Sequence, residues 1–131
     1  MTLAEYFSTR KGIGVLASAD ADGHVDAAIY SRPHFMEDGT LAFIMRNRLT
    51  HDNLNSNPYA TYLFIEEGNG YKGKRLFFRK VGEEKETERL YELRRRSYPA
   101  DNNPEEDPKF LVFFELERTL PLLGEGENPS Q

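Results

Sequence analysis

The chain has 131 residues, a formal net charge of −5 and an isoelectric point of about 5.2, so it lacks the basic balance that nucleic acids and anionic membranes favour. It contains no cysteine, which excludes disulfides and thiolate metal sites. No apolar run approaches the ~20 residues of a membrane-spanning helix. We expect one domain over residues 1–123 and a flexible tail over 124–131. A cytoplasmic location follows by default, because the first residues do not resemble a secretory signal.

The first part of the chain predicts a short helix and two strands. Thr2 and Glu5 have the spacing of a capping box, in which each residue satisfies a backbone or side-chain donor of the other. The small apolar residues 13–19 predict a first strand. A hairpin turn centred on Asp22-Gly23 then leads into a long second strand over residues 25–35.

The middle of the chain predicts a hairpin followed by a helix. Glu37-Asp38-Gly39 has the composition of a tight turn, and residues 41–46 form an almost wholly apolar run of strand length. Thr50 is a plausible N-cap for a short helix over residues 52–56. Asn57-Pro58 ends that helix, because the residue before a proline disfavours helical backbone.

The remaining residues predict three further strands and one charged helix. The strands cover residues 59–65, 74–81 and 110–120, and the helix covers residues 83–96, with a loop over 97–108. Six strands at short spacing, with hairpin turns and few helices, are typical of an antiparallel barrel. The sequence therefore predicts a mainly β protein: a six-stranded antiparallel split β-barrel with small helices.

Polar and cationic side chains follow the buried third strand. Arg46, Arg48, Thr50 and Asn53 lie where that strand gives way to the start of a helix. Helix N-termini carry partial positive charge, and arginine adds bidentate donors, so this corner suits a phosphate. The alternative is a solvated loop with an ordinary threonine cap.

This order of elements resembles the pyridoxamine 5′-phosphate oxidase-like family, the FMN-binding split barrels. The resemblance covers roughly residues 3–81 and rests on Ala28-Ile29-Tyr30-Ser31-Arg32-Pro33, Leu41-Ala42-Phe43-Ile44-Met45, Arg48-Leu49-Thr50-His51-Asp52-Asn53-Leu54 and Asn57-Pro58. It implies a homodimer that binds FMN in a groove at the subunit interface. An apolar face would then be exposed on each separate subunit.

The resemblance also implies which residues contact the cofactor. The second strand would line the flavin ring, the third strand and the corner after it would hold the phosphate, and Lys72 would contact the flavin of the second subunit. The residues concerned are Ile29, Tyr30, Ser31, Arg32, Pro33, Ile44, Met45, Arg46, Arg48, Thr50, His51, Asn53 and Lys72. For Arg32 the alternative is an edge-strand cation that deters aggregation. No residue is assigned a catalytic role.

The resemblance implies an FMN-dependent oxidoreductase or flavin reductase acting on a small molecule. Vitamin B6 oxidation itself fits poorly, because those oxidases carry a C-terminal segment with Trp and Arg, whereas this chain has no Trp. The alternatives are a non-catalytic barrel that binds FMN or haem, as an electron carrier or binding module, and a barrel with an empty groove. We expect no metal site, because the three histidines lack a spacing such as HExxH.

Overall fold

The computed structural model describes residues 1–97 and 108–125, without the side chains of residues 95–97. The helices are α1 (Leu3–Thr9), α2 (Leu49–Ser56) and α3 (Glu88–Ser97). The strands are β1 (Gly12–Ala19), β2 (Val25–Tyr30), β3 (His34–Phe35), β4 (Leu41–Arg46), β5 (Tyr59–Glu66), β6 (Gly73–Lys85) and β7 (Lys109–Pro121). In this part of the chain, no helix has the length and apolar character needed to cross a membrane.

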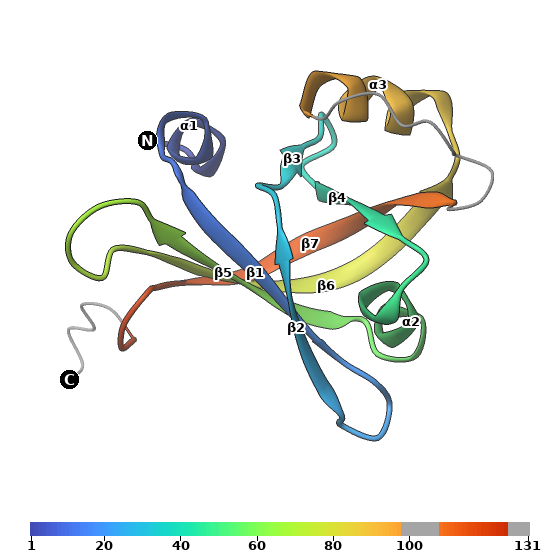
Figure 1. Ribbon diagram of the computed structural model, residues 1–131, viewed down its shortest axis with the longest axis horizontal. Coiled ribbons are helices and arrows are strands. Elements are labelled where there is room, and N and C mark those ends of the chain that lie inside the picture. The colour runs from blue at the N-terminus through green and yellow to red at the C-terminus, as the bar shows by residue number, and fades with distance from the viewer. Residues whose placement is uncertain (98–107, 126–131) are drawn as a thin grey trace.

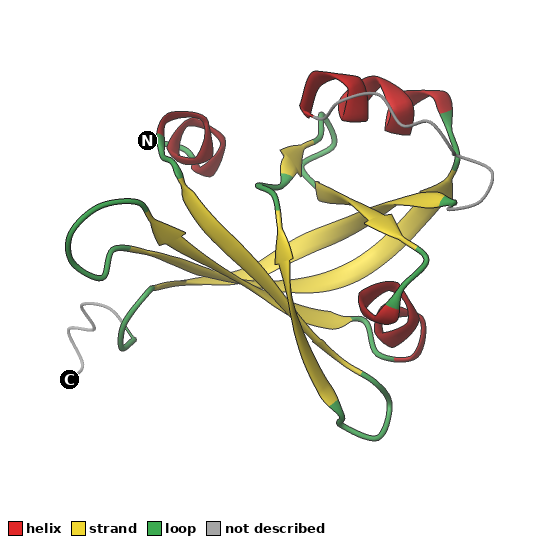
Figure 2. Cartoon of the chain, viewed as in Figure 1, coloured by secondary structure: helices red, strands yellow, loops and turns green. Residues whose placement is uncertain are grey.

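The strands form one curled antiparallel sheet in the order β2-β1-β5-β6-β7-β4-β3 (Figure 1). Its two end strands, β2 and β3, are separated in the chain only by residues 31–33. The chain therefore joins the two ends of the sheet and curls it into an open barrel, while the helices stay at its periphery (Figure 2). This confirms the predicted mainly β antiparallel split barrel, with seven strands instead of six.

Aromatic side chains fill the interior of the curled sheet. Phe43, Tyr62, Phe64, Phe78 and Phe114 are all at most 1% exposed. The Phe43 ring lies 5.1 Å from that of Tyr62 and 5.9 Å from those of Phe78 and Phe114. Such offset and edge-on contacts add to the energy of area burial and fix side-chain positions. The sheet is therefore a firm support for the residues at its open end.

The third predicted strand is confirmed as β4, and both of its faces are covered. Leu41, Phe43 and Met45 face the aromatic core, whereas Ala42 and Ile44 pack in a second cluster with residues of α3 and β7. A strand buried on both faces reads as a continuous apolar run, as observed in the sequence. Its last residue, Arg46, is exposed, so a cation lies at the end of the strand, where the buried part of β4 ends.

Two predicted local signals are confirmed by their hydrogen bonds. The Thr2 hydroxyl accepts from the Glu5 backbone N–H at 3.1 Å and caps α1. In the turn between β3 and β4, the N–H of Gly39 donates to the Met36 carbonyl at 3.1 Å, and Gly39 has a positive φ of 90°. Glycine reaches that conformation without the steric penalty of a side chain.

The turn between β1 and β2 lies one residue earlier than predicted. The N–H of Gly23 donates to the Asp20 carbonyl at 3.1 Å, so Ala21 and Asp22 occupy its centre. Gly23 follows with a φ of 86°. Gly23 is therefore the residue that follows the two central turn residues and adopts a positive φ, as in three-residue hairpin loops with a type I turn.

The predicted long second strand over residues 25–35 is wrong. β2 ends at Tyr30 and pairs with β1, whereas β3 begins at His34 and pairs with β4. Pro33 lies in the break, and a proline has no N–H to donate to a strand ladder. The interruption lets the chain leave one end of the sheet and join the other.

The predicted boundary between the fifth strand and the charged helix is also wrong. β6 continues to Lys85, through a register shift between Lys80 and Gly82, and Glu84 pairs with Leu111. The helix begins at Glu88 instead of residue 83. Charged residues at a surface can adopt either helix or strand, so the pairing with the long strand β7 determines that residues 83–85 are strand. The predicted loop over 97–108 and the predicted tail lie largely outside the described residues.

Candidate functional site

A cavity of about 710 Å³ opens between the edge strand β2 and the corner where β4 meets α2. β2 and β4 are not hydrogen-bonded neighbours in the sheet, so the cavity lies in the split of the barrel. Many of the predicted cofactor-binding residues line it: Ile29, Tyr30, Ser31, Ile44, Arg46, Arg48 and Thr50. The fold thus brings the predicted ring-lining strand and the predicted phosphate corner to one place.

The phosphate corner is the junction of β4 and α2. Arg48 is the N-cap of α2, and its carbonyl accepts the first helical hydrogen bond, from the Asp52 N–H at 3.0 Å. The N–H groups of the first helical turn therefore have no partner within the helix and carry partial positive charge. Arg48 is exposed and lines the cavity beside them.

The prediction that Thr50 caps this helix is wrong. The helix starts at Leu49, and the cap residue, Arg48, makes no side-chain capping bond. Thr50 instead lies within the first turn, where it is 4% exposed and lines the cavity. Its hydroxyl is consequently not needed to close the helix end and is available to a ligand.

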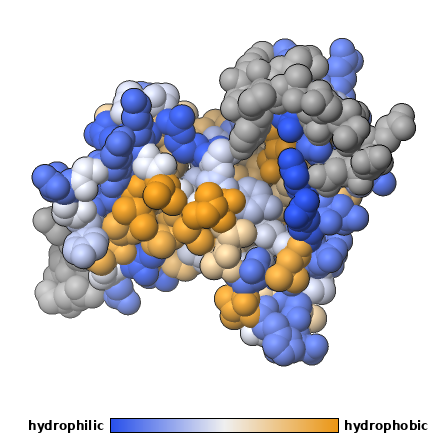
Figure 3. All heavy atoms as spheres, in the orientation of Figure 1, coloured by the Kyte–Doolittle hydropathy of each residue, from blue (hydrophilic) through white to orange (hydrophobic). Residues whose placement is uncertain are grey.

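The opposite wall of the cavity is apolar. Ile13 of β1 and Ile29 of β2 are 58% and 72% exposed, and both line it. Leu49 adds apolar surface from the side of the phosphate corner, at the start of α2, where it is 56% exposed. Figure 3 shows orange and blue surface side by side on this face of the molecule. A flat hydrophobic ligand with a charged end would match both parts.

Several predicted cofactor residues lie inside the protein instead. Met45 is 1% exposed in the aromatic core, and Pro33 is also buried. Asn53 donates from Nδ2 to the Ser18 hydroxyl at 3.1 Å, which ties α2 to β1. None of these side chains lines the cavity.

His51 is also buried, between α2 and the sheet. Its ring stacks on Phe110 with centroids 3.8 Å apart, and its Nε2 lies 3.0 Å from a carboxylate oxygen of Glu83. Burial raises the pKa of Glu83, but a hydrogen bond and the charge of Lys80, followed by His51, outweigh it and leave that pKa below its usual value. His51 therefore holds α2 against the sheet and does not line the cavity.

Two predicted cationic contacts lie elsewhere. The Arg32 guanidinium donates to the carbonyls of Phe7 at 2.7 Å and Arg10 at 3.0 Å, so it holds the end of α1. Lys72 belongs to the loop between β5 and β6 and does not line the cavity. The assignment of both residues to cofactor binding stays a prediction.

The cavity also contains cations that the sequence alone did not reveal. Arg94 comes from α3 and Lys109 from the first position of β7. Lys109 and Arg46 are partners in the ladder between β4 and β7. The sequence signal was weak, since a single lysine before an apolar strand is common, and only the strand register shows its neighbour.

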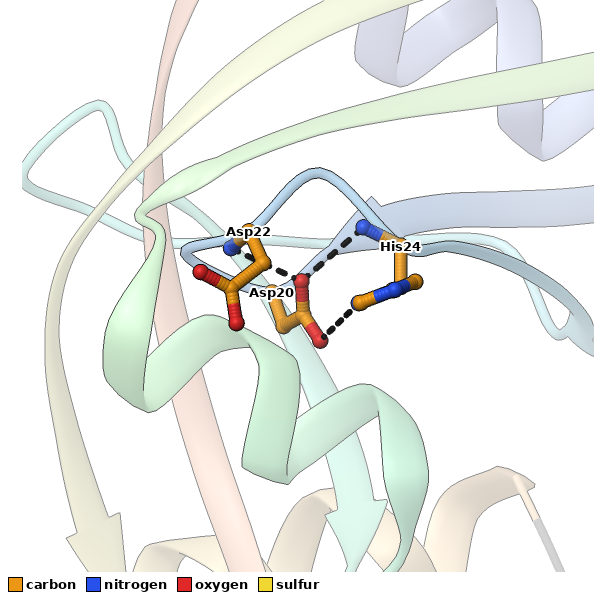
Figure 4. Close-up of side chains that lie close together, drawn as sticks. All are labelled: Asp20, Asp22 and His24. Carbon is orange, nitrogen blue, oxygen red and sulfur yellow. Dashed lines mark hydrogen bonds and ion pairs between the residues drawn. The ribbon is translucent and has the colours of Figure 1, made fainter.

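A cluster of possible metal ligands lies in the turn between β1 and β2. Asp20, Asp22 and His24 bring oxygen or nitrogen atoms within 4.8 Å of one another. One Asp20 carboxylate oxygen accepts from the N–H groups of Asp22 and His24 at 2.9 Å, and the other lies 3.0 Å from His24 Nδ1 (Figure 4). These bonds, led by that from the His24 N–H, lower the pKa of Asp20. The cluster is accounted for as an aspartate-stabilised turn.

Comparison with solved structures gives several close matches in fold. An FMN-binding protein from Syntrophomonas wolfei has a TM-score of 0.68 and 18% identity, over 90% of this chain and 82% of that one. A candidate pyridoxamine 5′-phosphate oxidase from Listeria innocua has a TM-score of 0.64 and 20% identity, over 92% and 94%. HutZ, the haem storage protein from Vibrio cholerae, has a TM-score of 0.59 and 18% identity, over 90% of each chain. No family model and no curated protein sequence matches the chain.

Proposed function

We propose that this chain, which has the split-barrel fold of the pyridoxamine 5′-phosphate oxidase-like proteins, binds FMN in the cavity between β2 and α2. The observation that carries the proposal is the phosphate corner opening into the same cavity as an apolar wall. FMN has both parts, a phosphate and a planar ring. The volume of about 710 Å³ lies within the range of typical small-molecule sites, roughly 300–1,000 Å³.

The residues of the corner suit the phosphate. Arg48 supplies a permanently charged, multidentate donor, the first turn of α2 supplies backbone N–H groups, and Thr50 supplies a hydroxyl. All three kinds of donor come from one short stretch of chain that Asn53 and His51 hold against the sheet. The donors for the phosphate are therefore held in position before binding, which lowers the entropic cost of binding.

The apolar wall and the free edge of β2 suit the ring. Ile13 and Ile29 offer an exposed hydrophobic surface. β2 is the last strand of the sheet, so one side of its backbone is not used in the sheet ladder and can hydrogen-bond the polar edge of a ligand. When bound, FMN would supply the electron transfer, and the protein supplies binding, orientation and exclusion of water.

We propose in addition that the protein is an oxidoreductase or flavin reductase that acts on a small molecule. The alternative is a non-catalytic barrel that holds FMN or haem. The likeness in fold to a haem storage protein supports this alternative. Haem iron is usually held by a side-chain ligand such as histidine. His24, His34 and His51 are all described and do not line the cavity, which favours the flavin.

A visible absorption spectrum of the purified protein, before and after incubation with excess FMN, tests this proposal. Two broad bands that stay with the protein through gel filtration are the expected result. A Soret band after incubation with haem, without flavin uptake, would favour the alternative. Reduction of the bound flavin by NADH or NADPH under anaerobic conditions would then separate an enzyme or carrier that accepts their electrons from a storage module.

We further propose that the protein is a homodimer. Val25, Ile29 and Ile13 are 77%, 72% and 58% exposed on the neighbouring strands β2 and β1, next to Ile65 of β5 at 37%. Contiguous exposed apolar surface of this kind marks an interaction surface. Because Ile13 and Ile29 also line the cavity, a second copy on this face would cover the ring of the cofactor.

A further inference from the structure

We infer that Asn69, in the loop between β5 and β6, is a modification site: its side-chain amide deamidates spontaneously and becomes a carboxylate. The inference is independent of the proposed function, because no residue of this loop lines the cavity. Asn69 is followed by Gly70, and all residues from Glu67 to Lys72 are exposed. Figure 1 shows this loop projecting from one end of the sheet.

Deamidation of an asparagine that precedes a glycine proceeds through a cyclic imide. The backbone nitrogen of Gly70 attacks Cγ of Asn69, the new C–N bond closes a succinimide ring, and the bond between Cγ and Nδ2 breaks. The proton of the Gly70 N–H leaves with the released ammonia. Water then opens the ring at either carbonyl carbon and gives aspartate or isoaspartate. Water is therefore the co-reactant, and the loop gains a negative charge.

The backbone around Asn69 leaves the attacking nitrogen accessible. An N–H that donates to a carbonyl is held in place and keeps its proton. Neither the N–H of Gly70 nor the amide of Asn69 has a hydrogen-bond partner among the described residues. Gly68 and Gly70 have positive φ values of 124° and 89°, and glycine has no side chain to obstruct the attack. The loop thus provides the backbone freedom that ring closure requires.

Two other pairs with the same chemistry are held by their turns. An aspartate before a glycine can form the same cyclic imide, and the sequence contains Asp22-Gly23 and Asp38-Gly39. The N–H groups of both glycines, however, donate to the carbonyl three residues earlier, each at 3.1 Å. Of the three pairs that end in glycine, the structure therefore leaves the nitrogen unbonded only at Asn69-Gly70.

Asn55 provides a matched comparison in the same chain. It is exposed, as Asn69 is, and precedes the small residue Ser56. Both residues belong to α2, in which the backbone N–H groups are used in the helical hydrogen bonds. The Lys80 ammonium also donates to the Asn55 side-chain oxygen at 3.3 Å. The two asparagines are thus alike in exposure and differ in the freedom of the backbone that follows them.

The base of the loop should keep its structure after the reaction. The N–H of Glu66 donates to the Lys72 carbonyl and that of Glu67 to the Lys11 carbonyl, both at 2.8 Å. These bonds lie outside the tip at residues 68–70, where isoaspartate adds an atom to the backbone. We therefore expect the aged protein to retain the circular dichroism spectrum and melting temperature of the fresh protein.

Ageing of the purified protein at mildly alkaline pH tests the inference, because base removes the proton from the attacking nitrogen. Digestion after glutamate, at mildly acidic pH, separates Asn55 from Asn69, since Glu66 and Glu67 lie between them. We expect the Asn69 peptide to gain the mass of an amide-to-acid change and to split into aspartate and isoaspartate forms. With residues assigned by fragmentation, Asn69 should react at least about tenfold faster than Asn55, whose helix must open first.

Two variants distinguish the structure of the loop from its sequence. Asn69→Gln lengthens the side chain, which disfavours ring closure, and should abolish the change at this position. Ser56→Gly places a glycine after Asn55 within α2. In the folded variant we expect Asn55 to stay intact, whereas in urea it should deamidate as Asn69 does, because unfolding removes the helical hydrogen bonds.

Three results would overturn the inference. The first is an aged parent protein in which the Asn69 peptide keeps its mass. The second is deamidation of Asn55 as fast as that of Asn69 in folded Ser56→Gly, because the pair of residues alone would then decide. The third comes from labelling the aged protein with a methyltransferase specific for isoaspartate. The label should be confined to the Asn69 peptide, and equal labelling at Asp22 or Asp38 would show that the loop does not select its site.

Discussion

The hydroxyl of Tyr62 donates a 3.0 Å hydrogen bond to the carbonyl oxygen of Ser31. Tyr62 lies at the centre of β5 and is fully buried, whereas Ser31 is the first residue of the break between β2 and β3 and lines the cavity. The aromatic core therefore extends past β1 and holds the segment that closes the barrel. Gly14 makes room for this contact, because a Cβ at that position would lie 1.9 Å from the Tyr62 hydroxyl oxygen.

Replacing Gly14 by alanine should therefore destabilise the fold and loosen the cavity wall. The Tyr62 ring cannot withdraw, since Phe7, Phe43 and Phe64 surround it. Overpacking of this kind costs about 1–3 kcal/mol in the free energy of unfolding. Urea unfolding followed by circular dichroism measures it, with Tyr62→Phe as a comparison that removes only the hydrogen bond, for about 1 kcal/mol. A Gly14→Ala protein as stable as the parent would contradict the close packing.

Arg32→Gln should act on α1 and not on the cofactor. Arg32 donates to two backbone carbonyls at the end of α1, those of Phe7 and Arg10, and its side chain does not line the cavity. Loss of these bonds should increase amide hydrogen exchange in α1 while FMN affinity changes less than about twofold. Unchanged exchange together with a tenfold weaker FMN affinity would instead support the role that the family resemblance implied.

The acid stability of the protein should depend on Glu83. Its pKa is depressed in the folded protein by Lys80 and His51, against the effect of burial. A depressed carboxyl pKa contributes stability that is present above the unfolded value, 4.5, and is lost as the pH falls through the folded value. Unfolding free energies of parent and Glu83→Gln should therefore differ at pH 7 and converge as the pH falls below 4.5. A gap that is unchanged at low pH would contradict this linkage.

A charge on the apolar face should separate the proposed dimer. Ile29→Glu places a carboxylate on a side chain that is 72% exposed on β2, so the monomer should fold normally. Light scattering after gel filtration should then give the mass of one chain instead of two. Val81→Glu alters an exposed apolar residue on β6 and should leave the dimer intact. A parent protein that elutes as a monomer at all concentrations would contradict the proposal.

Much of the fold could be predicted because its signals are local. The turn at Asp38 and Gly39 and the apolar run of β4 each follow from a few adjacent residues, and the structure confirms both. The predictions were wrong where pairing with residues distant in the sequence determines the local structure. Residues 83–85 read as the start of a charged helix, yet their pairing with β7 makes them strand. Pro33 lies where the chain changes strand partners from β1 to β4, a change that depends on the whole sheet and not on residues near Pro33 in the sequence.

The candidate site shows the same division. Arg48 and Thr50 could be proposed from the sequence because they follow a buried strand directly and belong to the same short segment. Arg94 and Lys109 could not, since their place at the cavity depends on the packing of α3 and on the register between β4 and β7. Asn53 was predicted for the same site as Thr50. Its amide donates inward to Ser18 and does not line the cavity, so its role in cofactor binding stays a prediction.

Calorimetric titration of FMN and riboflavin into the parent protein and into an Arg48→Gln, Thr50→Val variant tests the central claim most directly. The two ligands share the ring and differ in the phosphate, and the substitutions remove a charge and a hydroxyl from the phosphate corner with little change of shape. We expect the parent to bind FMN more tightly than riboflavin, and the variant to lose at least about tenfold in FMN affinity with little loss for riboflavin. Equal weakening of both ligands, or a parent protein that binds neither, would contradict the account.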